Sequence, residues 1–259
     1  MKTIRVFSLF LVLLSSSSWG QSSDNWDWQV TPYLWMVGID GELSVGPIDQ
    51  DIDASFSDIL SDLDFGASVF AGFGKGRHAF HFDYTYLRLK PDATALPTPP
   101  FPIDSTLSSK MTFNIFEPAY NYRFNGLNST SLVLGARYMD IEMRMTPNVN
   151  LPDLPPGLIP DRGALTAGPN WWDYFVGVKT HNKIGANWDF EFYGTVGTGG
   201  SDLPWTLQAI FGRRFSNDNR LDLGFRVWNI DYSNNEGVLD QYTNIDAKFY
   251  GFMVGYQFN

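Results

Sequence analysis

Apolar and polar positions alternate with a period of two along most of the chain, and the pattern is clearest over residues 243–258. Every second position near the end is aromatic or apolar, and the set closes with Tyr250, Phe252, Val254, Tyr256 and Phe258. A period of two places this set on one face of a β-strand and the smaller, more mixed residues between them on the other. An aromatic outer face is typical of the closing strand of a bacterial outer-membrane barrel, so we expect Tyr250, Phe252, Tyr256 and Phe258 to lie at the membrane interface.

The same alternation predicts ten strands. They cover residues 26–38, 64–74, 78–89, 108–124, 130–144, 170–182, 187–198, 203–215, 219–232 and 243–258. Short connections at 75–77, 125–128, 183–186 and 216–219 alternate with long ones at 39–63, 90–107, 145–169 and 233–242, and a tight one lies around 199–202. Outer-membrane barrels sort their connections by length in this way, whereas a soluble β-sandwich has no reason to. The sequence therefore predicts an all-β fold: a transmembrane, antiparallel up-and-down β-barrel of about ten strands, with eight or twelve as alternatives, short periplasmic turns and long external loops.

Several charged residues fall on the inward face of these strands. The predicted lumen network consists of Glu117, Arg137, Lys179, Asp189, Glu191, Arg214 and Arg226. A turn centred near Leu127 places Glu117 opposite Arg137, and a turn centred near Ile184 places Lys179 opposite Asp189. Two interpretations follow: a charge-lined constriction that selects solutes, or an ion network that fills a narrow barrel and fixes its register. Barrels of about eight strands are filled by side chains, so ten strands favour the second.

The first twenty residues have the form of a cleavable secretory signal. Lys2 and Arg5 precede an apolar stretch at 6–14 and a small-residue stretch at 15–20, and nine apolar residues are too few to span a bilayer. We therefore divide the chain into a signal peptide, 1–20, and an outer-membrane barrel, 21–259. The chain has no Cys, which excludes both disulfides and a lipid-anchored cysteine.

Composition agrees with a membrane barrel. Aromatic residues make up 16% of the chain while its mean hydropathy is only −0.17, as expected where an apolar lipid face alternates with a polar lumen. Beyond residue 20 there is no run of about 18 apolar residues that would form a transmembrane helix. Loss of Lys2 and Arg5 with the signal leaves 16 basic against 28 acidic side chains, a net charge of −12. Such a chain repels phosphates, so nucleic acid is not an expected partner.

No arrangement of residues predicts catalysis, a cofactor or a metal site. The three histidines, His78, His81 and His181, lie near the predicted periplasmic turns, and no nucleophile motif accompanies them. We therefore expect a protein that is not an enzyme.

Two kinds of external loop are candidates for binding. Loop 39–63 carries Asp40, Glu42, Asp49, Asp51, Asp53, Asp58 and Asp62, with Ser57 as a candidate N-cap of a short helix through Leu63. A divalent cation bridging these acids to lipopolysaccharide is one interpretation, and a solvated acidic loop is the simpler one, because the spacing fits no calcium loop. Loops 90–107 and 145–169 hold 11 of the 15 Pro and several apolar residues that a partner or a plug would use.

Several spaced motifs resemble a widespread family of uncharacterised proteobacterial outer-membrane β-barrel proteins. They are Thr31–Gly38 with Ile39-Asp40-Gly41, residues 54–65, Gly135–Tyr138, Trp172–Val178, Val196–Leu203 with Trp205, and Asp231-Tyr232. The resemblance spans essentially the whole mature chain. It implies a barrel in the outer membrane and implies no activity.

Three functional hypotheses remain open from the sequence. The first is a structural or narrow-pore outer-membrane protein with a charge-paired lumen. The second is a carrier of small apolar molecules, suggested by Phe70, Phe249 and Met253 at lumen positions and by the apolar loops, and the third is a surface interaction protein. Expected partners are outer-membrane lipid and lipopolysaccharide, the barrel-assembly machinery, and a small solute or apolar ligand. The expected location is the outer membrane of a Gram-negative bacterium.

Overall fold

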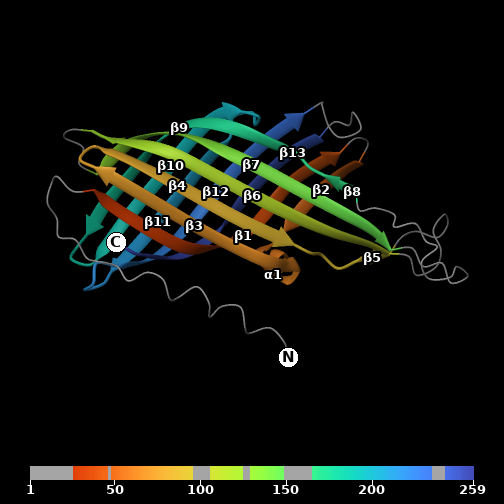
Figure 1. The fold of residues 1–259 in the computed structure, drawn as a ribbon, viewed down its shortest axis with the longest axis horizontal. Coiled ribbons are helices and arrows are strands. Elements are labelled where there is room, and N and C mark those ends of the chain that lie inside the picture. The colour runs from red at the N-terminus through yellow and green to blue at the C-terminus, as the bar shows by residue number, and fades with distance from the viewer. Residues whose placement is uncertain (1–25, 46–47, 96–105, 125–128, 149–164, 235–242) are drawn as a thin grey trace, which may run out of the picture.

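The fold is a closed barrel of ten long antiparallel strands, as the sequence predicts (Figure 1). A computed structural model describes residues 26–45, 48–95, 106–124, 129–148, 165–234 and 243–259. The wall strands are β1 (Asp27–Val45), β3 (Leu63–Lys75), β4 (His78–Leu89), β6 (Thr106–Arg123), β7 (Thr130–Asn148), β9 (Asn170–Ile184), β10 (Trp188–Gly199), β11 (Trp205–Arg214), β12 (Arg220–Asn234) and β13 (Thr243–Gln257). Each pairs with the next, and β13 pairs with β1 to close the wall. The predicted signal peptide, 1–20, lies outside the described residues.

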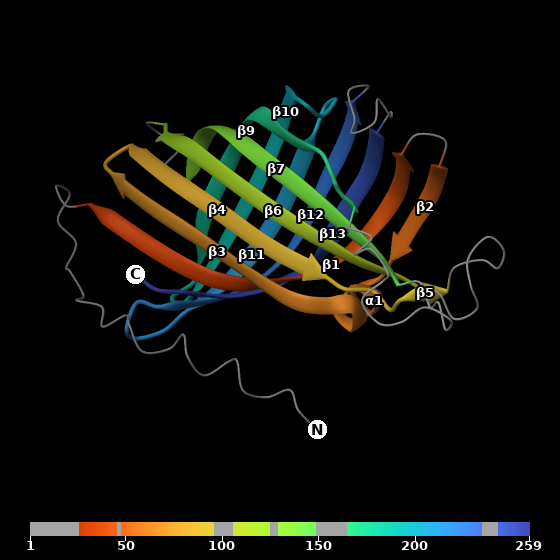
Figure 2. The ribbon, with the colours of Figure 1, turned by 45° about the vertical axis from the view of Figure 1, so that its right-hand side comes forward.

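Three short strands and one helix extend the wall at one end. Strand β2 (Ile48–Ala54) pairs with β1, β5 (Thr94–Ala95) with β6, and β8 (Leu165–Ala167) with β7. Helix α1 (Phe56–Asp62) joins β2 to β3. We call this end, which also carries the β10–β11 connection at 200–204, the loop end. The turn end is the opposite one and carries the short turns at 76–77, 185–187 and 215–219 (Figure 2).

The segment predicted as loop 39–63 is largely regular structure, which corrects the sequence analysis. Strand β1 continues to Val45 and folds back as β2 before α1 begins. The acids that suggested a loop, such as Asp40 and Glu42, occupy the outward positions of a strand whose alternation simply continues. Acids are tolerated there because the apolar belt of β1 ends at Met36 and Gly38, so these positions face water.

The outer face of the wall is a continuous apolar belt. Exposed outward side chains include Leu34, Phe65, Val69, Phe82, Leu134, Val176, Leu207, Phe211, Leu223, Phe252 and Val254. A soluble monomer rarely exposes an apolar patch of more than a few hundred Å², whereas a belt around a barrel is the surface that lipid requires.

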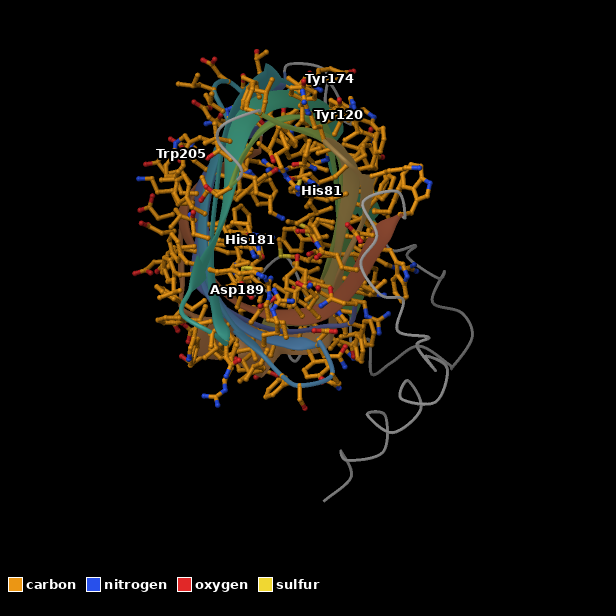
Figure 3. The ribbon with its side chains drawn as sticks, turned by 90° about the vertical axis from the view of Figure 1, so that its left-hand side faces the viewer. His81, Tyr120, Tyr174, His181, Asp189 and Trp205 are labelled. Atoms are coloured by element: carbon orange, nitrogen blue, oxygen red, sulfur yellow. The ribbon has the colours of Figure 1, made fainter. Side chains whose placement is uncertain are left out.

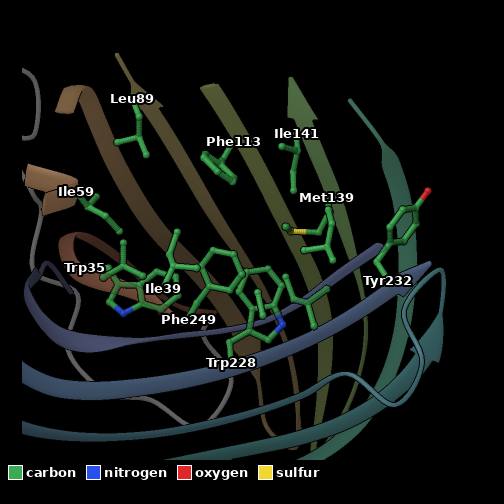
Figure 4. Packing of buried hydrophobic residues seen from close by; sticks show 14 of the residues in the cluster. Trp35, Ile39, Ile59, Leu89, Phe113, Met139, Ile141, Trp228, Tyr232 and Phe249 are labelled. Atoms are coloured by element: carbon green, nitrogen blue, oxygen red, sulfur yellow. The ribbon is translucent and has the colours of Figure 1, made fainter. Parts of the chain in front are cut away.

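The lumen is divided into two halves, which the sequence did not predict. At the loop end the inward side chains form one apolar cluster, here called the apolar plug (Figure 4). Its members are Trp35, Val37, Ile39, Ile59, Leu89, Phe113, Met139, Ile141, Trp171, Trp228, Ile230, Tyr232, Ile245, Ala247, Phe249 and Met253. The half toward the turn end is polar. The expectation of a polar lumen is therefore wrong for the loop-end half, because a filled barrel needs a core rather than a water channel.

Candidate functional site

A buried ion pair lies in the middle of the lumen, at the base of the apolar plug. The Arg137 Nε of β7 donates to Glu117 Oε2 of β6 at 2.7 Å, so the two residues meet across the β6–β7 hairpin. Tyr193 of β10 donates to the second Glu117 oxygen at 2.7 Å, and Arg137 also donates to Thr206 of β11 at 2.9 Å. The guanidinium lies 4.5 Å from the centre of the Trp228 ring. Both charges are therefore paired and hydrogen-bonded, as burial in a low-dielectric interior requires.

A second pair crosses the lumen from one wall to the far wall. Arg226 of β12 donates to Asp83 of β4 at 2.8 Å, although β3, β1 and β13 separate these two strands along the shorter way around the barrel. Its Nε donates to Gln208 at 2.6 Å, and Tyr33 of β1 donates to the other Asp83 oxygen at 2.6 Å. The Arg226 guanidinium also lies 5.3 Å from the Trp35 ring. These contacts join four strands, β12, β4, β11 and β1, across the lumen.

A third group of charges fills the lumen nearer the turn end. Lys179 pairs with Glu191 at 3.3 Å, and Arg214 donates to Asp189 at 2.8 Å. Glu191 also pairs with Arg220, whose guanidinium in turn donates to Asp222 at 3.0 Å. His181 lies between the two acids, 3.1 Å from Glu191 and 3.3 Å from Asp189. Figure 3 shows His181 and Asp189 pointing into the ring of strands, together with His81.

The predicted pairing of Lys179 with Asp189 is wrong. Strand β9 continues to Ile184, and Gly185, with a φ of +75°, makes the turn, so Lys179 lies opposite Tyr193 and Asp189 lies opposite Lys183. A turn centre two residues later moves the register by four. The seven predicted lumen residues still all lie inside the barrel. Lys179 pairs with Glu191, and Asp189 pairs with Arg214.

Five participants were missing from the predicted network. They are Tyr33, Asp83, Tyr193, Arg220 and Asp222. Asp83 and Asp222 occupy inward positions in the alternation of their strands, and this pattern indicates that they belong to the lumen. Arg220, the first residue of β12, also occupies an inward position. Tyr33 and Tyr193 are uncharged phenols, so a search for charged inward residues does not find them.

The polar half contains two small adjoining cavities of about 50 and 60 Å³. The first is bordered by the two ion pairs and by the indoles of Trp35 and Trp228, whose N–H groups have no hydrogen-bond partner among the described residues. Cavities of this size hold a few water molecules, which are suitable acceptors for these donors. The polar half of the lumen therefore contains small spaces bordered by paired charges.

The histidines lie where the sequence places them, toward the turn end. His78 is exposed and bonds Tyr120, while His81 is buried beside Asn121 at 2.8 Å and stacks on Phe70. Among the residues that the structure describes, no group of three or more His, Cys, Asp or Glu is arranged to hold a metal ion. The described helix is too short and too polar to cross a membrane.

A buried carboxylate, Asp173, lies at the loop end and has no cation partner among the residues that the structure describes. Asp173 of β9 accepts from the Ser201 backbone N–H at 2.7 Å, from the Ser201 hydroxyl at 2.9 Å and from the Trp171 indole at 3.1 Å. Trp171 stacks on Tyr232 with ring centres 4.1 Å apart. These contacts hold the connection at 200–204 against the rim of the lumen. The sequence analysis noted the motif at 196–205 only for its resemblance and did not predict this role.

The acidic residues of 39–63 form part of a row on the outer surface, beyond the apolar belt. Asp231, Asp246, Glu42 and Asp51 are consecutive cross-strand neighbours on β12, β13, β1 and β2. Burial raises the pKa of Asp231, and the charges of Asp246 and Asp202 raise it further. Like charges in direct opposition disfavour the folded state.

Helix α1 is fixed by a capping box at its start. Ser55, rather than the predicted Ser57, is the N-cap, and its hydroxyl and backbone N–H both donate to Asp58, at 2.6 and 2.9 Å. The hydroxyl hydrogen bond is the main reason that the pKa of Asp58 is lowered. Ser55 precedes the helix by one residue, which is the position from which a side chain reaches the free backbone N–H groups.

On β13, all four residues predicted for the membrane interface point away from the lumen. Phe252 is 63% exposed, and Tyr256 packs edge-on against Phe258 near the turn end. Their depth in a bilayer stays a prediction. Most of the Pro-rich loops, including the apolar residues at 96, 101, 151, 154, 158 and 159, lies outside the described residues.

Neither a family model nor a curated protein sequence matches the chain. Its fold does match solved structures. The outer-membrane protease OmpT from Escherichia coli aligns over 89% of this chain and 96% of that chain, with 8% identity and a TM-score of 0.51. The chain has the fold of a bacterial outer-membrane β-barrel. Looser likenesses include Neisserial surface protein A, with 12% identity, a TM-score of 0.33 and coverage of 90% and 98%. The toluene transporter TbuX of Ralstonia pickettii has 9% identity, a TM-score of 0.33 and coverage of 90% and 89%. At these identities the likeness is one of fold alone.

Proposed function

We propose that this chain is a sealed barrel of the Gram-negative outer membrane, with a structural rather than a conducting role. The single observation that carries the proposal is the Arg226–Asp83 pair, which crosses the lumen between β12 and β4. A conducting pore needs charged groups that line water, whereas these side chains meet each other in the path that an ion would take. The narrow-pore hypothesis is the alternative.

The apolar plug supports the same proposal. An ion that passed the polar half would next have to cross a packed cluster in which Met139 and Ile230 are fully buried. Moving a charge through such a region without partners is far more costly than leaving it in water. The polar pairs then serve to satisfy the interior and fix the register of the strands, which is the structural interpretation of the network.

Solute flux into proteoliposomes tests the proposal. Wild-type protein should leave liposomes as tight to small sugars and ions as protein-free controls are. A variant with Trp35→Gly and Trp228→Gly removes the two indoles that border the first cavity, and should allow measurable flux. Flux through the wild type at the rate of the double variant would refute a sealed lumen.

Location and family are proposals of the same kind. The signal-like segment at 1–20, the apolar belt and the outer-membrane fold together support insertion in the outer membrane, beside lipopolysaccharide. Membership in the uncharacterised proteobacterial family rests on the sequence resemblance. Recovery of the protein from the soluble periplasm, rather than from outer-membrane fractions, would contradict this location.

A further inference from the structure

The barrel wall has a break between β1 and β3. Strand β1 pairs with β3 only from Asp27 to Tyr33, and with β2 only from Ile39 onward. Residues 34–38 of β1 therefore have no ladder partner on that side, and residues 63–67 of β3 have none on the side of β1. At about 3.3 Å per residue, this unpaired stretch of five residues, here called the β1–β3 slot, is roughly 16 Å long. The other junctions of the described wall have continuous or nearly continuous pairing.

The break lies at the level of the apolar belt, not above it. Its outer edges are formed by Leu34, which is 50% exposed, and by Phe65, which is 45% exposed. The acidic positions of β1 begin only after it, at Asp40. Unpaired backbone groups are costly in hydrocarbon, so an opening at this depth has to be covered by the protein itself.

Helix α1 runs from the end of β2 to the start of β3, so it lies at the mouth of the slot, and Ala54 and Leu63 at its two ends also pack against the apolar plug. The helix packs against β1 and β2, and Ile59 is its one buried residue. Ile59 belongs to the apolar plug, where Figure 4 shows it beside Trp35. The next residue, Leu60, is 51% exposed. Ile59, carried on a seven-residue helix, thus adds an aliphatic group to the plug next to the stretch where β1 and β3 do not pair.

We propose that the β1–β3 slot is a lateral binding site for a small, uncharged, hydrocarbon-rich molecule dissolved in the outer leaflet, which takes the place of Ile59. The proposal is independent of the sealed lumen, because a molecule that enters through the wall does not cross the polar half. It concerns a ligand from the bilayer, not one from water through the Pro-rich loops.

The chemistry around the slot selects this occupant. The inner side is formed by plug residues, with Trp35 and Val37 on β1, and the outer side faces lipid. No charged side chain stands on either edge within 34–38 or 64–67 except Asp64, at the top, where Arg88 already binds it at 2.5 Å. A charged or strongly polar ligand would lose its hydration without finding partners. An apolar ligand leaves one apolar phase for another and fills space that α1 vacates.

Cysteine labelling tests the opening, since the chain has no native Cys. Ile59→Cys and, as a matched control, Ile141→Cys place one thiol each in the plug; the two isoleucines are 5% and 7% exposed. In liposomes, the Ile59→Cys variant should react with a membrane-soluble pyrene maleimide about tenfold faster than the Ile141→Cys variant, a ratio that corresponds to a modest opening free energy. Equal slow rates for the two variants would overturn the proposal. Faster reaction of the Ile59→Cys variant with a membrane-impermeant sulfonated maleimide would also overturn it, because α1 would then open to water.

Binding of a fluorescent apolar probe tests the site. N-phenyl-1-naphthylamine should bind the wild type saturably, and Ile59→Ala should raise its affinity about tenfold, with Leu60→Ala on the same helix leaving it unchanged. An excess of decane should displace the probe. Heat-modifiable migration of each variant verifies that the barrel has folded. If folded Ile59→Ala and Leu60→Ala bind the probe alike, or if no variant binds it saturably, the lateral site does not exist. Neither result bears on the flux test of the sealed lumen.

Discussion

At the scale of single residues, each buried charge of the mid-lumen has an opposite charge beside it, with neutral donors around the carboxylates and neutral acceptors around the guanidinium groups. Glu117 accepts from Arg137 and from Tyr193, so the removal of one partner leaves a carboxylate with part of its shell intact. Arg137 has Thr206 and the Trp228 face in addition to Glu117. When one member of such a network is lost, the remaining charge stays buried without its partner, so the free energy of unfolding should fall.

The Glu117–Arg137 pair gives a quantitative test. Glu117→Gln and Arg137→Met should each lower the free energy of unfolding, by about 3–5 kcal/mol if the remaining charge finds no partner. The double variant should recover part of the loss. Urea unfolding of the refolded protein in detergent measures all three. Strictly additive losses would mean that the two residues do not interact.

The exposed Arg88–Asp64 pair supplies the control for that cycle. It has comparable length, 2.5 Å, but both side chains are about one-third or more exposed. Asp64→Asn should leave the unfolding midpoint unchanged, because water already solvates both groups. A large loss here would show that the assay responds to any altered charge.

The acidic row predicts a stabilising substitution. Asp246→Asn removes one carboxylate between Asp231 and Glu42 and should raise stability by about 0.2–1 kcal/mol at pH 7. The pKa of Asp231 is raised in the fold, so its repulsion is present above that pKa and is lost as pH falls through it. The gain should therefore shrink toward pH 4. A gain that is the same at both pH values would point to another cause.

At the scale of elements, alternation alone predicted the wall well. The inward face of β4, with His81, Asp83 and Thr85, and the outward face of β13 follow directly from parity, since each strand has one side in lipid. The β6–β7 register followed from a symmetric short turn. The predicted strand ends were wrong where a strand passes from the apolar belt into water. Acids on the outer face of β1 beyond Gly38 look like a loop in sequence, because the sequence does not show where lipid ends.

Other features of the site were beyond a pattern of this kind. The β9–β10 register depended on the turn centre, and several residues between 183 and 187 fit that position equally well in sequence. The Arg226–Asp83 contact joins strands far apart in sequence, and no local spacing reports it. The division of the lumen into an apolar and a polar half is only partly visible in sequence: alternation places Phe249 and Met253 inward but does not show that apolar inward residues gather at one end.

The β10–β11 connection makes a prediction at this scale. Asp173→Ala should loosen the segment 200–204, because Ser201 loses its two hydrogen bonds to Asp173 and Trp171 loses one, at a cost of about 1–3 kcal/mol. Amide exchange at Ser201 should then accelerate. Asp202→Ala, on the same segment but exposed, is the control and should leave exchange at Ser201 unaltered.

The closing strand, β13, leads to a second prediction at the scale of elements. Phe258→Ser removes an aromatic ring that packs on Tyr256 at the outer surface of β13, and we expect a lower yield of folded protein in the outer membrane. Gln257→Ser, at the inward position beside it, should have the smaller effect. Equal yields for wild type and Phe258→Ser would show that this ring does not guide assembly.

At the scale of the whole molecule, the protein is a ten-stranded barrel whose lumen is occupied by its own side chains. The plug occupies the half toward the loop end, and ion pairs cross the half toward the turn end, and on the proposed function these contents stabilise the barrel and block passage. The longest stretch without pairing in the described wall, between β1 and β3, lies at the level of the apolar belt, apart from the lumen contents that we propose to block the barrel axis.

Single-channel recording in planar bilayers tests the sealed lumen most directly. The purified, heat-modifiable wild type should insert without producing stepwise current at moderate voltage in molar salt, while the Trp35→Gly, Trp228→Gly variant should produce steps. Stable, charge-selective steps from the wild type, with a selectivity that Glu117→Gln or Arg226→Met alters, would contradict the account and show that these charges line water.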